Sequence, residues 1–305
     1  MKRSTSTLLM ALAASGCMRL DGFVFSTKPV EDLATDMLAG SKVPAQLREE
    51  VTEIVTEDGT KVNAYLLSHS ETDGHPASLH LTRPSIGIVY AHGQSNNLIS
   101  STPRLDILWD LGFTVLGYDA RGYGKTQGTA TQVGQEADAR AAVRYLETKL
   151  HPERVALYGR SLGSLFMTKV AAEEPNARAL ILESPVLSLQ KIIDDSMSVD
   201  TPAGWYMDSA MSNEAELPKF KGALLILHGD ADDYVKFEYG QRLHELATAT
   251  PNEFVAVPGA DHGNVPCTDL VTVRPDDAPD DCLGGTSTLY ADSVGGFLDR
   301  IFFSQ

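Results

Sequence analysis

The chain has 305 residues, of which 43% are hydrophobic and 22% are charged, an ordinary composition for a folded protein with a sizeable core. Its formal net charge is −16, so it lacks the excess of basic residues that neutralises nucleic-acid phosphates. These totals exclude a largely disordered chain, argue against a nucleic-acid partner, and fit one large domain or two small ones.

The first segment has the pattern of a secretory signal. After a short basic start, an apolar run covers Leu8–Ala14, and small residues precede Cys17. This arrangement resembles a bacterial lipoprotein signal, which implies a signal peptide over residues 1–16 and a lipid on Cys17. Met18, rather than Asp, after the cysteine implies the periplasmic side of the outer membrane in a Gram-negative cell. The alternative is an ordinary signal peptide that is cleaved nearby.

A leader and a hairpin come next. Residues 17–50 are predicted to act in part as a tether, and the main domain is expected over residues 51–305. Val51–Thr56 and Val62–Leu67 have extended character and flank a turn with Asp-Gly at its centre. This pattern predicts a β-hairpin.

From residue 86 onward, continuous apolar runs alternate with segments of helical spacing. The predicted strands are Ile86–Ala91, Phe113–Tyr118, Val155–Tyr158, Ala179–Leu182, Ala223–Leu227 and Glu253–Val257. The predicted helices are Arg104–Leu111, Glu136–Leu150, Leu165–Glu174, Phe237–Ala249 and Ser293–Phe303. This alternation is typical of an α/β fold, with a mostly parallel sheet, helices on both faces and the hairpin as an antiparallel edge.

The run Gly159-Arg160-Ser161-Leu162-Gly163 joins an apolar strand directly to a helical segment. This Gly-x-Ser-x-Gly pattern in a strand–turn–helix context is typical of a nucleophile elbow. Because the two glycines lack Cβ atoms, strand and helix can approach closely around the turn. The pattern therefore predicts that Ser161 is an exposed nucleophile; the alternative is a plain glycine-rich turn.

Two further strand ends carry groups that such a serine requires. Asp230, Asp232 and Asp233 follow the strand Ala223–Leu227 and are candidates for an acid, and His262 lies in a loop after the last predicted strand. A serine hydroxyl is a weak nucleophile, so an imidazole must take its proton and a carboxylate must orient the imidazole. His262 is the predicted base; the alternative is a structural histidine.

The tetrahedral intermediate of such a reaction needs two backbone N–H donors. Leu162, directly after the serine, is one candidate. The other is Gln94, in the loop that follows His92-Gly93, through its backbone N–H rather than its side chain. His92 itself is interpreted as structural.

Two segments interrupt the strand–helix alternation. Residues 186–221, which contain Trp205, Tyr206, Met207 and Met211, are predicted to form a small cap. Its aromatic residues could line an acyl pocket; the alternative for each is ordinary packing. Residues 265–286 form an insert with Cys267 and Cys282, which an exported protein can oxidise to a disulfide; the alternative is two free thiols. The acidic residues of this insert are interpreted as solvated rather than as a calcium site, so no metal and no cofactor is expected.

Taken together, these motifs resemble the α/β-hydrolase superfamily, in particular its Bem46/ABHD13–ABHD17-like serine hydrolases. The resemblance covers about residues 51–264 and the closing helix. In that family's His-Gly-x-x-Asp-x-x-Val pattern the acid is the fifth residue, which implies Asp232 here. The loop after His92-Gly93 and the insert with the two cysteines depart from the family pattern.

The predicted function is that of a serine hydrolase acting on small-molecule acyl esters or thioesters through an acyl-enzyme. The alternatives are a serine peptidase or amidase with the same triad, and an inactive membrane-tethered binding protein. The expected partners are an acyl substrate and, through the N-terminal lipid, a membrane surface. The sequence does not indicate the oligomeric state.

Overall fold

The computed structural model describes Phe25, Thr27, Cys282 and the ranges 29–70, 83–94, 97–197, 211–267 and 285–303. The predicted signal peptide, Cys17, the aromatic residues of the cap and the acidic residues of the insert lie outside these ranges. Among the helices of the described ranges, none has both the length and the apolar character to cross a lipid bilayer.

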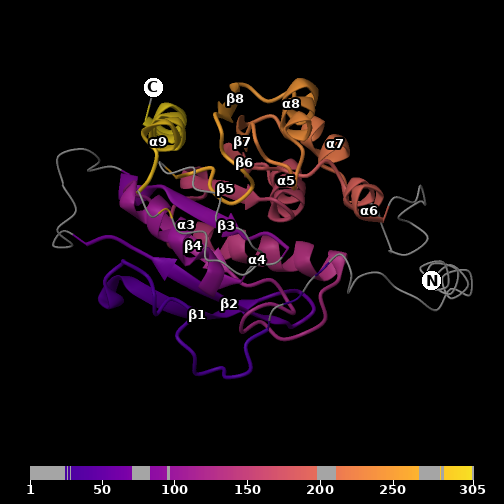
Figure 1. The fold of residues 1–305 in the computed structure, drawn as a ribbon. Coiled ribbons are helices and arrows are strands. Elements are labelled where there is room, and N and C mark those ends of the chain that lie inside the picture. The colour runs from indigo at the N-terminus through magenta and orange to yellow at the C-terminus, as the bar shows by residue number, and fades with distance from the viewer. Residues whose placement is uncertain are drawn as a thin grey trace, which may run out of the picture.

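One sheet of eight strands forms the centre of the molecule (Figure 1). In chain order, the strands are β1 (Arg48–Val55), β2 (Lys61–Leu67), β3 (Gly87–Ala91), β4 (Thr114–Tyr118), β5 (Val155–Arg160), β6 (Ala179–Glu183), β7 (Ala223–Gly229) and β8 (Asn252–Val257). Their spatial order is β1-β2-β4-β3-β5-β6-β7-β8. The β1–β2 and β2–β4 pairs are antiparallel and the others are parallel, so the predicted sheet with its antiparallel edge is confirmed.

Helices cover both faces of this sheet. They are α3 (Leu98–Asp110), α4 (Gln132–Lys149), α5 (Gly163–Glu173), α6 (Leu189–Met197), α7 (Asn213–Glu216), α8 (Phe237–Leu246) and α9 (Thr288–Phe303). Short 3₁₀ turns lie at Ala45–Leu47, Arg83–Ser85, Pro152–Arg154 and Leu217–Lys219. Side chains of α4, α5 and α8 pack in one hydrophobic cluster, and those of α3 and α9 pack in the other.

Strand residues alternate between these two clusters. Val89 and Leu116 belong to the first, whereas Ile88 and Val115 belong to the second. Successive side chains of a strand point to opposite faces, so a strand covered on both sides must be apolar at every position. This explains why the inner strands have continuous apolar runs rather than an alternating pattern.

Several helices begin earlier than the sequence predicts; α9, for example, starts at Thr288 rather than Ser293. α3 starts at Leu98, six residues before the expected start, because the Asn97 side chain accepts a hydrogen bond from the Ser100 N–H and caps the helix. Pro103 lies inside this helix, which is why its first turns were not predicted. α4 starts at Gln132, where Thr131 provides the cap by accepting from the Gly134 N–H.

Part of the predicted leader packs on the domain. Phe25 lies 6.5 Å from Phe166 between ring centroids, and Met37 and Leu38 are buried in the cluster beneath α3 and α9. Asp106 of α3 accepts a hydrogen bond from the Lys42 N–H at 2.7 Å. The packed domain therefore extends in front of residue 51, where the sequence placed its start.

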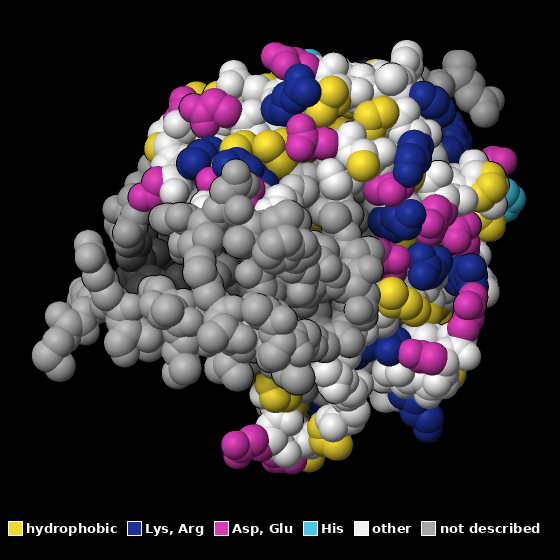
Figure 2. Space-filling view, turned by 90° about the vertical axis from the view of Figure 1, so that its right-hand side faces the viewer, with side chains coloured by type: hydrophobic (Ala, Val, Ile, Leu, Met, Phe, Trp, Pro, Cys, Tyr) yellow, Lys and Arg dark blue, Asp and Glu magenta, His cyan; other side chains and the backbone are white. Residues whose placement is uncertain are grey.

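The surface carries charges of both signs close together. On the face shown in Figure 2, Lys and Arg side chains alternate with Asp and Glu side chains instead of gathering in a stripe. Exposed charges of the described ranges also form pairs, such as Arg144 with Glu57 and Lys149 with Glu53. Exposed pairs of this kind contribute little to stability, about 0–1 kcal/mol each.

Candidate active site

The predicted elbow is present between β5 and α5, but Ser161 is buried, with an exposed fraction of 5%, and not exposed as the sequence predicts. Ser161 has a φ of +51°, a left-handed conformation that is unusual for a residue with a side chain. The Ser161 N–H donates to the Glu183 carbonyl at 2.9 Å, and the Ser164 N–H donates to the Ser161 carbonyl at 3.0 Å. These bonds to β6 and to the first turn of α5 hold the strained residue in place.

Both glycines of the motif are required by close backbone contacts. A Cβ on Gly159 would lie 2.7 Å from the Ser164 Cα, and a Cβ on Gly163 would lie 2.4 Å from the Ala91 carbonyl oxygen. Neither contact leaves room for a side chain, because backbone atoms cannot move aside as a flexible side chain can. The glycines thus let α5 begin directly against β3 and β5.

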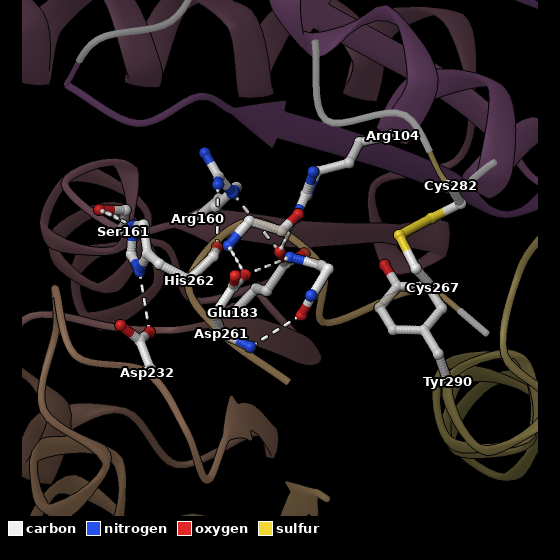
Figure 3. A network of polar contacts seen from close by, with 12 residues as sticks. Arg104, Arg160, Ser161, Glu183, Asp232, Asp261, His262, Cys267, Cys282 and Tyr290 are labelled. Atoms are coloured by element: carbon white, nitrogen blue, oxygen red, sulfur yellow. Dashed lines mark hydrogen bonds and ion pairs between the residues drawn. A yellow bond between two sulfur atoms is a disulfide. The ribbon is translucent and has the colours of Figure 1, made fainter. Parts of the chain in front are cut away.

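The structure brings His262 between Ser161 and Asp232 (Figure 3). His262 Nε2 lies 3.1 Å from Ser161 Oγ, and His262 Nδ1 lies 2.8 Å from Asp232 Oδ2. Ser161 follows β5, Asp232 follows β7 and His262 follows β8, so the three meet at the carboxyl edge of the sheet. If Nδ1 carries the ring proton that Asp232 accepts, Nε2 is left to accept the serine proton.

Asp232 is held as a carboxylate. Its Oδ1 accepts from the N–H groups of Tyr234 at 3.0 Å and Val235 at 2.8 Å, and its Oδ2 lies 3.3 Å from His228 Nε2. Burial opposes ionisation, but the hydrogen bonds from His228 and His262 outweigh it and hold the pKa of Asp232 below its usual range. Asp230, a competing candidate for the acid, instead accepts from the Gly259 N–H at 2.6 Å.

The loop after β3 lies against the serine. A Cβ on Gly93 would be 3.3 Å from the Ser161 Cβ and 3.7 Å from its Oγ, so Gln94 follows directly on a residue in contact with Ser161. His92 Nδ1 lies 2.8 Å from the Gly93 carbonyl oxygen, and burial lowers the pKa of His92 to about 4. His92 is therefore neutral at neutral pH and binds its own loop, which agrees with a structural role.

A small cavity opens beside this loop. Its walls include Gly93, Leu162, Tyr118, Tyr123 and Phe166, which are apolar or aromatic. Leu162, one of the two predicted N–H donors, lines this cavity, and the other, Gln94, follows the lining residue Gly93 in the chain. On the outer side, Tyr234 is 63% exposed and its ring centroid lies 5.0 Å from that of His262. Tyr234 is thus an exposed aromatic residue beside the ring of His262.

Sequence reasoning missed several residues of this site. His228 contacts Asp232, and a buried cluster of Arg104, Arg160 and Glu183 contacts the loop that carries His262. The available signal was one charged residue at the end of an otherwise apolar strand, as at Arg160 in β5 and Glu183 in β6. A charge at that position must find a buried partner.

The two cysteines of the insert form a disulfide, Cys267–Cys282, so the pairing is confirmed. Cys267 follows the His262 loop closely, and the Ser287 N–H donates to the Pro266 carbonyl at 2.8 Å. The disulfide therefore joins the chain that leaves the histidine loop to the segment that begins α9 (Figure 3).

Comparison with known proteins agrees with this architecture. The family model described as "Serine aminopeptidase, S33" matches residues 83–211. Protein Rv2307c of Mycobacterium tuberculosis strain H37Rv is 30% identical over 234 residues, which cover 74% of this chain and 75% of that protein. The chain belongs to the α/β-hydrolase superfamily. Human α/β-hydrolase domain-containing protein 17B is 30% identical over 181 residues, 58% of this chain and 60% of that protein.

Solved structures of esterases share the fold. The Pyrococcus furiosus esterase Pf2001 superposes with a TM-score of 0.65 at 19% identity, covering 90% of this chain and 97% of the esterase. The esterase domain of a Rhodothermus marinus protein gives a TM-score of 0.55 at 21% identity, covering 83% and 98%. The expected fold class is thus confirmed, and by family and fold the chain is a serine-hydrolase-like enzyme.

Proposed function

We propose that this α/β-hydrolase cleaves acyl esters or thioesters through Ser161, His262 and Asp232. The observation that carries the proposal is the position of His262, which contacts Ser161 Oγ at 3.1 Å and Asp232 Oδ2 at 2.8 Å. The left-handed backbone of Ser161 supports it, because such strain is typical of a nucleophile elbow.

The reaction has two steps in this proposal. His262 Nε2 takes the Ser161 proton as Oγ attacks the carbonyl carbon, and the backbone N–H groups of Gln94 and Leu162 stabilise the oxyanion. His262 returns the proton to the leaving alkoxide or thiolate, which leaves an acyl-Ser161 ester. Water activated by His262 then releases the acid. Throughout, Asp232 stabilises the imidazolium.

A fluorophosphonate probe tests the proposal directly. The purified wild-type protein is expected to form a covalent adduct with the probe, and Ser161→Ala is expected to form none. Ser164→Ala is a matched control, since Ser164 is a buried serine three residues further along. An unlabelled wild-type protein, or equal labelling of Ser161→Ala, refutes a serine mechanism and favours the inactive binding protein.

Amide or peptide hydrolysis is the second candidate, and the description of the matching family as a serine aminopeptidase favours it. The same triad serves both reactions. A chromogenic short-acyl ester compared with an aminoacyl amide that has the same leaving-group chromophore separates them. A kcat/KM for the amide at or above that for the ester assigns a peptidase.

We also propose export and a lipid anchor on Cys17, on the basis of the N-terminal sequence alone. In a bacterial expression host, the wild-type protein is expected in the membrane fraction, and Cys17→Ser is expected in the soluble fraction. Cys267→Ser is the control, because it removes a cysteine that is disulfide-bonded and distant in the sequence. Full membrane retention of Cys17→Ser contradicts the lipid anchor.

A further inference from the structure

A buried cluster of two arginines and one glutamate lies next to the histidine loop. Arg104, Arg160 and Glu183 are 1%, 4% and 0% exposed, respectively. They come from α3 and from the last positions of β5 and β6, where Arg160 and Glu183 are direct neighbours across the two strands. The cluster carries two positive charges and one negative charge away from water, which is costly unless each charge is bound.

Both arginines bind the backbone of the histidine loop. Arg160 Nη2 donates to the His262 carbonyl oxygen at 3.0 Å, and Arg104 Nη2 donates to the Gly263 carbonyl oxygen at 2.9 Å (Figure 3). Two consecutive carbonyls are thus held by donors that belong to the buried sheet and to α3. Arg160 directly precedes the nucleophile Ser161. It therefore connects the elbow to the backbone of His262, whose ring contacts Ser161.

Glu183 holds the two guanidinium groups in place. Its Oε1 accepts from Arg104 Nε at 2.9 Å and from Arg104 Nη2 at 2.6 Å, and it lies 3.4 Å from Arg160 Nε. Its Oε2 accepts from Tyr158 Oη at 2.5 Å. Burial alone opposes ionisation of Glu183, but the charges of Arg104 and Arg160 outweigh it and lower the pKa of this carboxyl. The carboxylate is therefore charged and orients both arginines.

We propose that Arg160 and Arg104, oriented by Glu183, are positioning residues that set the distance from His262 Nε2 to Ser161 Oγ. The inference rests on the proposed function, because it takes His262 as the base. His262 lies in a loop, outside any strand or helix, so its ring position depends on what holds the loop backbone. A displacement of about 1 Å at a reacting group can lower a rate about 100-fold.

The kinetic test uses Arg160→Lys and Arg104→Lys. Lysine keeps the charge next to Glu183, so these variants are expected to fold, but an ammonium group lacks the planar fork that reaches both the carboxylate and a carbonyl. For hydrolysis of a chromogenic short-acyl ester, Arg160→Lys is expected to lower kcat about 100-fold and to leave KM nearly unchanged. Arg104→Lys, whose carbonyl contact is one residue further from the ring, is expected to have the same effect but weaker.

Arg83→Lys is the matched control. Arg83 is also buried, forms two hydrogen bonds to Asp299 at 2.9 and 2.5 Å, and donates to the Leu111 carbonyl at 2.8 Å. It precedes β3, at the end of that strand opposite the site. Arg83→Lys is expected to lower the melting temperature about as much as Arg160→Lys does, while its kcat remains that of the wild type.

A second measurement needs no substrate. The proton between His262 Nδ1 and Asp232 is expected to give a far-downfield ¹H NMR signal, assigned by its absence in His262→Gln. The signal is expected to broaden or disappear in Arg160→Lys and to remain in Arg83→Lys. If Arg160→Lys and Arg104→Lys keep both this signal and the wild-type kcat, the inference is wrong. If the wild-type protein hydrolyses no ester, the proposed function fails, while the signal still decides whether the arginines position His262.

Discussion

The elbow around Ser161 and the loop around His262 lie at the same edge of the sheet but are held in different ways. The turn of the elbow is local, because Gly159 and Gly163 permit a tight connection between β5 and α5, with added support from the Ser161 N–H bond to the Glu183 carbonyl of β6. The histidine loop depends on distant residues, among them Arg104 and Arg160. The nucleophile thus sits on a turn whose shape is set mainly by adjacent residues, whereas the loop of its partner is held mainly by residues far away in the sequence.

Hydrogen bonds within the histidine loop also stabilise it. They determine the conformation of the loop, not its position relative to Ser161. Asp261 Oδ1 accepts from the N–H groups of Gly263 at 2.8 Å and Asn264 at 3.1 Å, which closes a compact turn. Because these hydrogen bonds lie within the loop, they set the shape of the turn but not its position in the fold. The contacts from the buried arginines and the disulfide determine where it lies relative to Ser161.

The largest predicted effect concerns the chemistry that joins the two regions. His262→Ala is expected to lower kcat/KM for an ester about 10⁴-fold or more, because the serine loses its base, while the fold remains. Steady-state kinetics measure kcat/KM, and circular dichroism shows whether the variant is folded. His244→Ala, in α8, is the control and is expected to be fully active. Near-normal activity of His262→Ala would mean that another group takes the serine proton.

A pH titration tests Asp119, a buried carboxyl that directly follows β4. Asp119 accepts from the N–H groups of Leu98 at 2.9 Å and Lys125 at 3.3 Å, and burial raises its pKa to about 7, whereas the arginines lower that of Glu183. The folded state then keeps a proton that the unfolded state loses above about pH 4. Stability is therefore expected to fall from about pH 4 to pH 7, by at most about 1.4 kcal/mol per pH unit, and to level off above.

Urea unfolding of the wild-type protein and of Asp119→Asn, repeated between pH 4 and pH 9, measures how the free energy of unfolding changes with pH. The variant cannot titrate at position 119, so its free energy of unfolding is expected to depend less on pH between 4 and 7. Above pH 8 the two slopes are expected to agree. Identical slopes throughout would mean that Asp119 titrates in its ordinary range in the folded protein.

Removing the disulfide tests the tertiary support of the histidine loop. The double variant Cys267→Ser/Cys282→Ser is expected to lose about 3 kcal/mol of stability, since the bridge closes a short loop. Its kcat is expected to fall less than that of Arg160→Lys, because the arginine contacts His262 itself. Reduction of the wild-type protein with dithiothreitol should reproduce both changes. An unchanged melting temperature in both experiments would show that the bridge does not stabilise the fold.

The smallest predicted effect concerns the local support of the elbow. Gly163→Ala places a Cβ against the Ala91 carbonyl oxygen and is expected to cost about 1–3 kcal/mol of stability. Gly296→Ala, in α9, is the matched control, since its Cβ would meet only the end of the Arg300 side chain at 3.3 Å. The control is expected to be neutral or to stabilise by up to about 1 kcal/mol. Equal effects of the two substitutions would contradict the close contact at Gly163.

Sequence patterns predicted the inner strands well and the helix starts less well. Continuous apolar runs identified β3 to β7, because strands buried on both faces leave few alternatives. The start of α3 was wrong, because an Asn97 cap outweighs an internal Pro103. The packing of Met37 and Leu38 was also missed, since an irregular segment has no period that reveals which face it covers.

The sequence by itself determined the strand–turn–helix at Ser161, because glycine spacing and an apolar strand are local properties. It also predicted which strand ends carry Asp232 and His262. Only the tertiary structure decided that these side chains meet within hydrogen-bond distance, and that Arg104, Arg160 and Glu183 lie behind them. The reason is physical: a buried charge shows in the sequence only as a polar residue in an apolar run, and its partner is set by the fold.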